Sequence, residues 1–277
     1  MSKKIPYLIL APGFILLIFF LLIPLVSVIW PTFYNGTLSF DSYLSFFKDA
    51  YNVGIFMRTV RVSVVVTVIC IILGVPTAYF IAGTSSKWRG LLMALTLFPM
   101  LTNSVIRSFA WINLLGQNGV INKLLTSIGI ISEPLTLLYT EFSIIIGSIY
   151  LFLPILIITL VGVMENINPE IMEAAETLGA SRIKAFIKVV LPLSIPGIIV
   201  GSILVFTGTL TAYTTPQLLG GNRNMMLSTF LYQNAMTLGN WEDASVIALI
   251  MIVTTLIVMK GFNLIAIRID KRGEQDA

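Results

Sequence analysis

Long apolar blocks separated by short polar stretches dominate the sequence. The blocks are apolar on every face, unlike the one-sided pattern of a surface helix or the alternation of a transmembrane β-strand. A helix of about 20 apolar residues crosses the hydrocarbon core of a bilayer. The pattern therefore predicts an all-α membrane protein with six transmembrane helices, at about residues 7–30, 57–82, 91–115, 142–164, 196–219 and 244–267.

The first block is predicted to be a retained helix. Lys3 and Lys4 precede it, as in a secretory signal, but the apolar run is longer than a signal core and no small-residue cleavage site follows Pro31. We therefore expect residues 1–277 to form a single transmembrane domain.

The basic residues predict the orientation. If the six spans are correct, most Lys and Arg residues fall on one side, which the positive-inside rule makes cytoplasmic. Both termini are then cytoplasmic, and so is the polar loop 165–195, where we look for function. The residues on this side are Lys3, Lys4, Lys87, Arg89, Arg182, Lys184, Lys188, Arg268, Lys271 and Arg272.

The amino-acid composition limits the kinds of functional site that we expect. The chain is 57% hydrophobic and 11% charged, contains no histidine, and has a single cysteine, Cys70. A catalytic centre built on histidine, a metal site and a disulfide framework are therefore not expected, and we expect no enzyme activity and no resident cofactor. The net charge of +4 is accounted for by the positive-inside pattern, so we expect no nucleic-acid partner.

The loop 165–195 predicts two short helices. Asn168 is a good N-cap, Pro169 suits the first helical position, and Gly179 can adopt the left-handed conformation that ends a helix. Ser181 is predicted to cap the second helix, and Pro192 to end it. That second helix is amphipathic, with an apolar face of Ile183, Phe186, Ile187 and Val190.

The first short helix carries an apolar stripe of Ile171, Ala175 and Leu178, with the small Ala174 beside it. Two interpretations are open on local physics. The helix could sit in a groove of another protein, or it could lie on the lipid headgroups.

A longer sequence pattern in the same loop resembles a motif of a known family. Glu173-Ala174-Ala175, followed by Gly179 and then by Val189, Leu191 and Pro192, resembles the EAA loop of permease subunits of binding-protein-dependent ABC importers. The family pattern has isoleucine where this chain has Val189, a conservative difference. The resemblance implies a type I ABC importer permease fold with a cytoplasmic EAA coupling helix, in which Glu173, Ala174, Ala175 and Gly179 couple the permease to an ATPase.

The same resemblance implies the partners. Permeases of this family work with two cytoplasmic ABC ATPase subunits, a paralogous permease and an extracytoplasmic binding protein, in the bacterial plasma (inner) membrane. This chain has no G-x-x-x-x-G-K-[ST] phosphate loop, so ATP and Mg are expected on the partner ATPase.

Segments 102–107, 116–119 and 213–221 resemble the spermidine/putrescine importer permeases, which implies polyamine import. Three alternatives stay open. They are the same importer class with iron, aminoethylphosphonate, an opine or another amine as cargo, an ATP-independent channel, and a secondary transporter.

A polyamine path should offer carboxylates and aromatic faces. The candidates are Trp111, Tyr150, Tyr213, Thr214, Trp241, Glu242 and Asp243. Competing explanations are an interfacial aromatic belt for the Trp and Tyr residues, helix-dipole capping for the acids, and a small-residue packing seam along the fifth helix. Arg107, inside the third predicted span, would repel a cation and is expected either to anchor helices or to lie near the outer surface.

Overall fold

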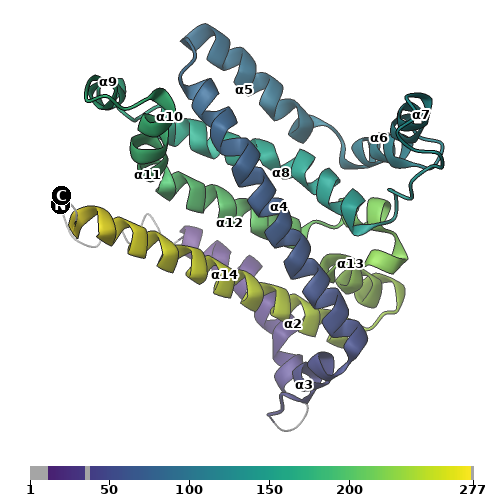
Figure 1. The fold of residues 1–277 in the computed structure, drawn as a ribbon. Coiled ribbons are helices and arrows are strands. Elements are labelled where there is room, and N and C mark those ends of the chain that lie inside the picture. Colours follow the sequence, from purple (N-terminus) through teal and green to yellow (C-terminus); the bar gives the residue numbers. More distant parts are fainter. Residues whose placement is uncertain (1–11, 35–37, 276–277) are drawn as a thin grey trace, which may run out of the picture. The chain divides into compact units, whose positions relative to one another are not determined.

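The computed structural model describes residues 12–34 and 38–275, and most of them are helical (Figure 1). The part of the first predicted span at residues 7–11 lies outside the described residues. The helices are η1 (Ile18–Leu22), α2 (Ile23–Phe33), α3 (Asp41–Lys48), α4 (Ala50–Ala82), α5 (Ser86–Leu101), α6 (Ser104–Leu115), α7 (Val120–Ser127), α8 (Glu141–Met164), α9 (Pro169–Thr177), α10 (Arg182–Ala185), η2 (Phe186–Val190), α11 (Leu191–Leu193), α12 (Ile195–Thr211), η3 (Pro216–Gly220), η4 (Asn222–Asn224), α13 (Leu227–Tyr232), η5 (Gln233–Thr237) and α14 (Trp241–Gln275).

Within the described residues, four helices are long and apolar enough to cross a membrane: Pro12–Phe33, Ala50–Ala82, Glu141–Met164 and Trp241–Leu264. Two bent pairs raise the number to as many as six if each pair is one span. Ser86–Leu101 meets Ser104–Ser127 at 90°, and Arg182–Leu193 meets Ile195–Thr211 at 68°. The predicted all-helical membrane fold is confirmed, and the described residues reach the predicted six spans if each bent pair is counted as one span.

The break between α5 and α6 falls inside the span predicted at 91–115. The Asn103 side chain caps α6 by accepting a hydrogen bond from the Val105 backbone N–H at 2.9 Å. The buried Arg107 donates to the Pro99 carbonyl at 3.0 Å and to the Thr102 carbonyl at 3.4 Å, so it satisfies backbone groups that the end of α5 leaves open. Arg107 therefore anchors two helix ends, which is the first of its two predicted roles.

The chain divides into two compact units, of which the first comprises residues 1–54 and 230–253. In this unit the hydroxyls of Thr32 and Tyr43 are hydrogen-bonded, and the Phe33 ring stacks on the Tyr43 ring at 5.0 Å between centroids. These contacts fix α3 against the end of α2.

The second unit, residues 55–229 and 254–277, contains the close packing of α8 (teal) against α12 (green) in Figure 1. Three glycines of α12, Gly197, Gly201 and Gly208, meet side chains of α8, and we call this contact the glycine seam. A methyl group at Gly201 would lie 2.4 Å from Leu156 Cδ1, and one at Gly208 would lie 2.5 Å from Phe152 Cε1. Small residues let membrane helices approach closely, so the seam holds the centre of this unit together.

α12 ends at Thr211, although the fifth span was predicted to reach residue 219. The chain then leaves the helix at residues 212–213 and re-forms short helical turns at Pro216–Gly220. The Ser228 hydroxyl donates to the Ala212 carbonyl at 2.6 Å. A broken helix is tolerated at membrane depth where its backbone groups find such partners within the protein.

Candidate functional site

Local sequence builds α9 as predicted. The Asn168 side chain accepts a hydrogen bond from the Glu170 backbone N–H at 3.0 Å, and Pro169 is the first helical residue. Gly179 has φ +89°, a left-handed conformation that closes the helix at low cost only for glycine. The predicted cap and terminator of this helix are both confirmed.

The second short helix differs from its prediction. Ser181 caps it through a hydrogen bond from the Lys184 backbone N–H at 3.4 Å, as expected, but residues Phe186–Val190 wind as a π-helix and the helix continues past Pro192 to Leu193. We call this segment, η2, the π-turn. It is wider than a turn of α-helix and therefore changes which side chains share a face. Val190 and Ala185 are buried, whereas Ile183 and Ile187, predicted on the apolar face, are exposed.

The predicted apolar stripe of α9 is largely open to solvent. Ile171 is 45% exposed and Leu178 is 89% exposed, and Ala174, one turn from each of them, is exposed as well. Ala175, predicted in the stripe, is half-buried. We call Ile171, Ala174 and Leu178 the exposed stripe of α9.

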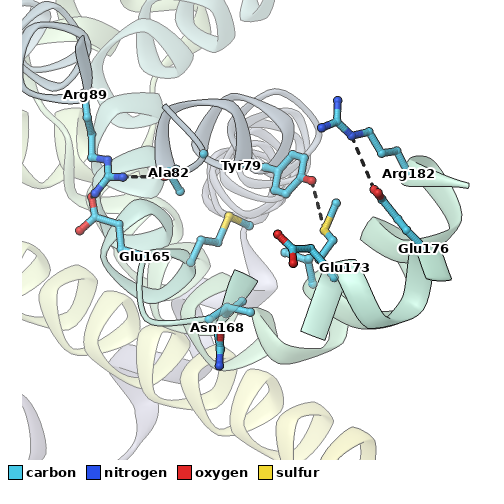
Figure 2. Close-up of a pocket in the computed structure, with 13 residues that line it drawn as sticks. Tyr79, Ala82, Arg89, Glu165, Asn168, Glu173, Glu176 and Arg182 are labelled. Atoms are coloured by element: carbon cyan, nitrogen blue, oxygen red, sulfur yellow. Dashed lines mark hydrogen bonds and ion pairs between the residues drawn. The ribbon is translucent and has the colours of Figure 1, made fainter. Parts of the chain in front are cut away.

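A cavity of about 410 Å³ lies beneath α9 (Figure 2). Its walls come from the end of α4, the start of α5, the end of α8, α9 itself and the following π-turn. The lining residues are Tyr79, Ala82, Gly83, Arg89, Met164, Glu165, Ile167, Asn168, Met172, Glu173, Glu176, Arg182 and Val190. We call it the α9 cavity.

Tyr79 joins three elements at the wall of the α9 cavity. Its hydroxyl donates to Met172 Sδ on α9 at 3.3 Å, drawn as a dashed line in Figure 2. Its ring lies 4.6 Å, between centroids, from the ring of Phe186. One side chain of α4 thus contacts both α9 and the π-turn that follows it.

Charged pairs flank the α9 cavity on two sides (Figure 2). Arg89 Nη1 lies 3.2 Å from Glu165 Oε1, and Arg182 Nε lies 3.6 Å from Glu176 Oε1. Arg89 also donates to the carbonyls of Ala82 and Thr84 at 2.9 Å each, which ties the end of α4 to the start of α5. The arginine therefore acts as a cap for α4 as well as an ion-pair partner.

The four residues assigned a coupling role by resemblance lie on α9 and its closing turn. Glu173 lines the cavity, Ala174 is exposed, Ala175 is half-buried, and Gly179 makes the left-handed turn. Sequence reasoning missed Tyr79 and Met172 as neighbours, because no local pattern joins residues so far apart. Arg89 entered the sequence analysis only as one of the basic residues that predict which side of the membrane is cytoplasmic.

Two of the predicted substrate-path residues meet in the second unit. The rings of Trp111 and Tyr150 are edge-to-face at 5.7 Å between centroids. Tyr213 lies in the break after α12, Thr214 begins the helical turns that follow it, and both are half-buried. Nearby, Glu141 is not a free carboxylate, because it accepts hydrogen bonds from both Arg58, at 3.1 Å, and Arg61.

The other three, Trp241, Glu242 and Asp243, belong to the first unit and are exposed in the first turn of α14. The Asp243 backbone N–H donates to the Asn240 side chain at 3.1 Å, and the Asn240 amide donates to the Asp243 carboxylate at 2.7 Å. Asp243 thus takes part in capping α14. In the part of the chain that the structure describes, no group of three Cys, Asp or Glu side chains is placed to hold a metal ion.

Comparison with known proteins adds to this picture. Residues 71–272 match the family described as binding-protein-dependent transport system inner membrane component. The spermidine/putrescine transport system permease protein PotB of Haemophilus influenzae is 32% identical over 241 residues, covering 84% of each chain. PotB of Escherichia coli is 28% identical, over 84% of this chain and 83% of its own.

A solved structure shows the same fold. The crystal structure of a bacterial alginate ABC transporter, in complex with an alginate pentasaccharide-bound periplasmic protein, contains a chain that superposes with a TM-score of 0.80 at 21% identity, over 95% of this chain and 94% of that one. The apolar helices and the family match together identify a multi-pass membrane protein. This chain belongs to the family of binding-protein-dependent transport system inner membrane components.

Proposed function

We propose that this chain is a permease subunit of an ATP-driven importer of polyamines, and that α9 is the helix that couples it to a cytoplasmic ATPase. The observation that carries the coupling role is the geometry of α9. A short capped helix presents Ile171, Ala174 and Leu178 to solvent and bears a small residue at the centre of the stripe. An exposed apolar stripe on a short helix fits a groove of a partner protein.

The cargo follows from the relatives. The PotB proteins named for spermidine and putrescine transport match 84% of this chain. The molybdenum transport system permease protein ModB of Mycobacterium bovis is 26% identical over 74% of this chain, so the match to a molybdenum permease is weaker and shorter. Import of polyamines is therefore favoured over other cargoes.

The remaining parts of the importer are expected on other chains. Two ATPase subunits bind ATP and Mg, a paralogous permease completes the path, and an extracytoplasmic binding protein delivers the substrate. Both termini of this chain are cytoplasmic in the bacterial inner membrane, and the chain catalyses no covalent step. ATP binding closes the ATPase dimer, moves α9, and opens the helix bundle outward to receive the polyamine.

The test is uptake of labelled spermidine and putrescine by cells that lack their own polyamine import and express the complete importer. Gly179→Asp should abolish uptake without reducing the amount of inserted permease, because an aspartate at φ +89° strains the turn and adds a charge beside the docking stripe. Gly129→Asp is the matched control: Gly129 also has positive φ, +73°, and open space around it, but it lies outside the α9 loop.

Two results would contradict the proposal. Uptake that survives Gly179→Asp would remove the coupling role of α9. An assembled, ATP-hydrolysing complex that imports no polyamine would remove the cargo and leave the importer class in place.

Docking can be measured directly by co-purification of the ATPase. Leu178→Asp, at the most exposed position of the stripe, should reduce recovery of the ATPase by at least about tenfold, since charged groups are excluded from the buried centre of an interface. Thr177→Asp puts the same charge on the same helix outside the stripe and should have a smaller effect. Equal losses for the two variants would show that the stripe is not the docking face.

A further inference from the structure

The α9 cavity leaves the coupling helix weakly supported on the side that faces the rest of the unit. About 410 Å³ is open between α9 and the ends of α4 and α8. Among the described ion pairs, the one that involves a charged residue of α9 joins Glu176 to Arg182, which belongs to the same loop. Few packed side chains are thus available to carry a displacement of α9 into the transmembrane helices.

Tyr79 bridges this open space. Its hydroxyl reaches Met172 Sδ at 3.3 Å, and its ring packs on Phe186 at 4.6 Å between centroids. Phe186 in turn belongs to the side chains packed against the core of the unit, together with Tyr79 itself. The contact with Met172 therefore joins α9 to a side chain that is already fixed on two other elements.

The chain itself connects α9 only to its neighbours in sequence. Residues 165–168 lead to α8, and residues 178–181 lead to α10 and then to α12. α4 lies nearly a hundred residues earlier in the chain and reaches α9 through noncovalent contact alone. A displacement of α9 can pass to α8 and α12 through the backbone, but it can pass to α4 only through side chains that touch.

We infer that Tyr79 is a positioning residue that transmits the movement of α9 to the end of α4. This inference rests on the proposed coupling function of α9. The aromatic ring holds the π-turn and the hydroxyl holds α9, so that α4, α9 and the π-turn move together. Loss of the side chain leaves α9 free to move in the α9 cavity without displacing α4.

The experiment uses the complete importer in proteoliposomes, with the loaded binding protein added and both ATP hydrolysis and spermidine uptake measured. Tyr79→Ala should lower the number of spermidine molecules imported per ATP hydrolysed by about fivefold or more, the size of a typical coupling between sites. Hydrolysis in the absence of binding protein and the amount of bound ATPase should stay unchanged. Tyr79→Phe keeps the ring contact with Phe186 but loses the hydroxyl that reaches Met172, so it should lower the ratio in the same direction as Tyr79→Ala.

Phe80→Ala is the matched control. Phe80 is the next residue on α4, is 67% exposed, and does not line the α9 cavity. It should leave the ratio of import to hydrolysis unchanged. Met172→Ala removes the same contact from the α9 side and should lower the ratio in the same direction as Tyr79→Ala, which keeps the test usable if Tyr79→Ala fails to insert.

Three outcomes would overturn the inference. They are an unchanged ratio in Tyr79→Ala and Met172→Ala, an equal loss in Phe80→Ala, and a loss of unstimulated hydrolysis or of bound ATPase that accounts for the whole effect. Failure of the proposed function looks different. In that case the wild-type complex itself shows no hydrolysis stimulated by binding protein and no spermidine uptake.

Discussion

The glycine seam and the α9 cavity belong to the same unit of the chain and are built in opposite ways. At the seam, three glycines of α12 lie so close to α8 that even a methyl group at Gly201 would overlap Leu156. Beneath α9, about 410 Å³ is open and bordered by ion pairs and one tyrosine. The seam fixes two helices, whereas the cavity allows one helix to shift.

This difference indicates how changes should act in each region. A densely packed contact has no room to absorb a larger side chain, so substitutions there act on folding. An open, charged region tolerates substitution, because water replaces lost partners and the ion pairs are partly solvated. Effects on stability should therefore fall from the seam to the α9 cavity, while effects on coupling should show the reverse order.

The largest expected effect is at the seam. Gly201→Leu should destabilise the permease by about 3 kcal/mol, the upper part of the usual range for overpacking, because Leu156 is fully buried and cannot move aside. Folded protein recovered in detergent and its thermal transition measure the loss. Gly162→Leu is the control, since Gly162 of α8 has open space around it.

A second variant makes this prediction sharper. Leu156→Ala alone should be destabilising, because it opens a cavity in the core. Combined with Gly201→Leu it should recover part of the loss, so that the double variant is more stable than the sum of the single changes. Strict additivity would show that the two residues do not compete for space.

An intermediate loss of stability is expected on substitution of Arg89, on the wall of the α9 cavity. Arg89→Ala removes the hydrogen bonds to the carbonyls of Ala82 and Thr84 and the ion pair with Glu165, and should cost about 1–2 kcal/mol, discounted because the side chain is 31% exposed. Hydrogen exchange should rise at the end of α4 and stay unchanged at the glycine seam. Lys87→Ala, an exposed residue two positions earlier, should change neither. Faster exchange across the seam would contradict the separation of the two regions.

The smallest loss of stability is expected on substitution of Glu176. Its carboxylate lies 3.6 Å from Arg182, whose side chain is 87% exposed, so Glu176→Gln should cost less than about 0.5 kcal/mol. What remains should disappear in high salt, which screens exposed charges. A loss above about 1 kcal/mol that persists in high salt would mean that this pair supports α9 in a way the geometry does not indicate.

Features that depend on near neighbours in the chain could be predicted before the fold was known. The apolar blocks predicted a helical membrane protein, since a span must satisfy its backbone within one helix. The cap at Asn168, the start of α9 at Pro169 and the left-handed turn at Gly179 were also predictable, because each depends on the backbone preferences of one residue.

Features that depend on distant contacts or on small changes of helical phase emerge only when the chain is folded. The contact between Tyr79 and Met172 joins residues 93 positions apart, and the pair of Arg89 with Glu165 joins different helices, so no local period reveals either. The apolar face of the second helix was predicted with two wrong members, Ile183 and Ile187, which are exposed. A period of 3.6 residues gives the spacing of a stripe, but packing selects which side of the helix is covered, and the π-turn shifts the phase after it.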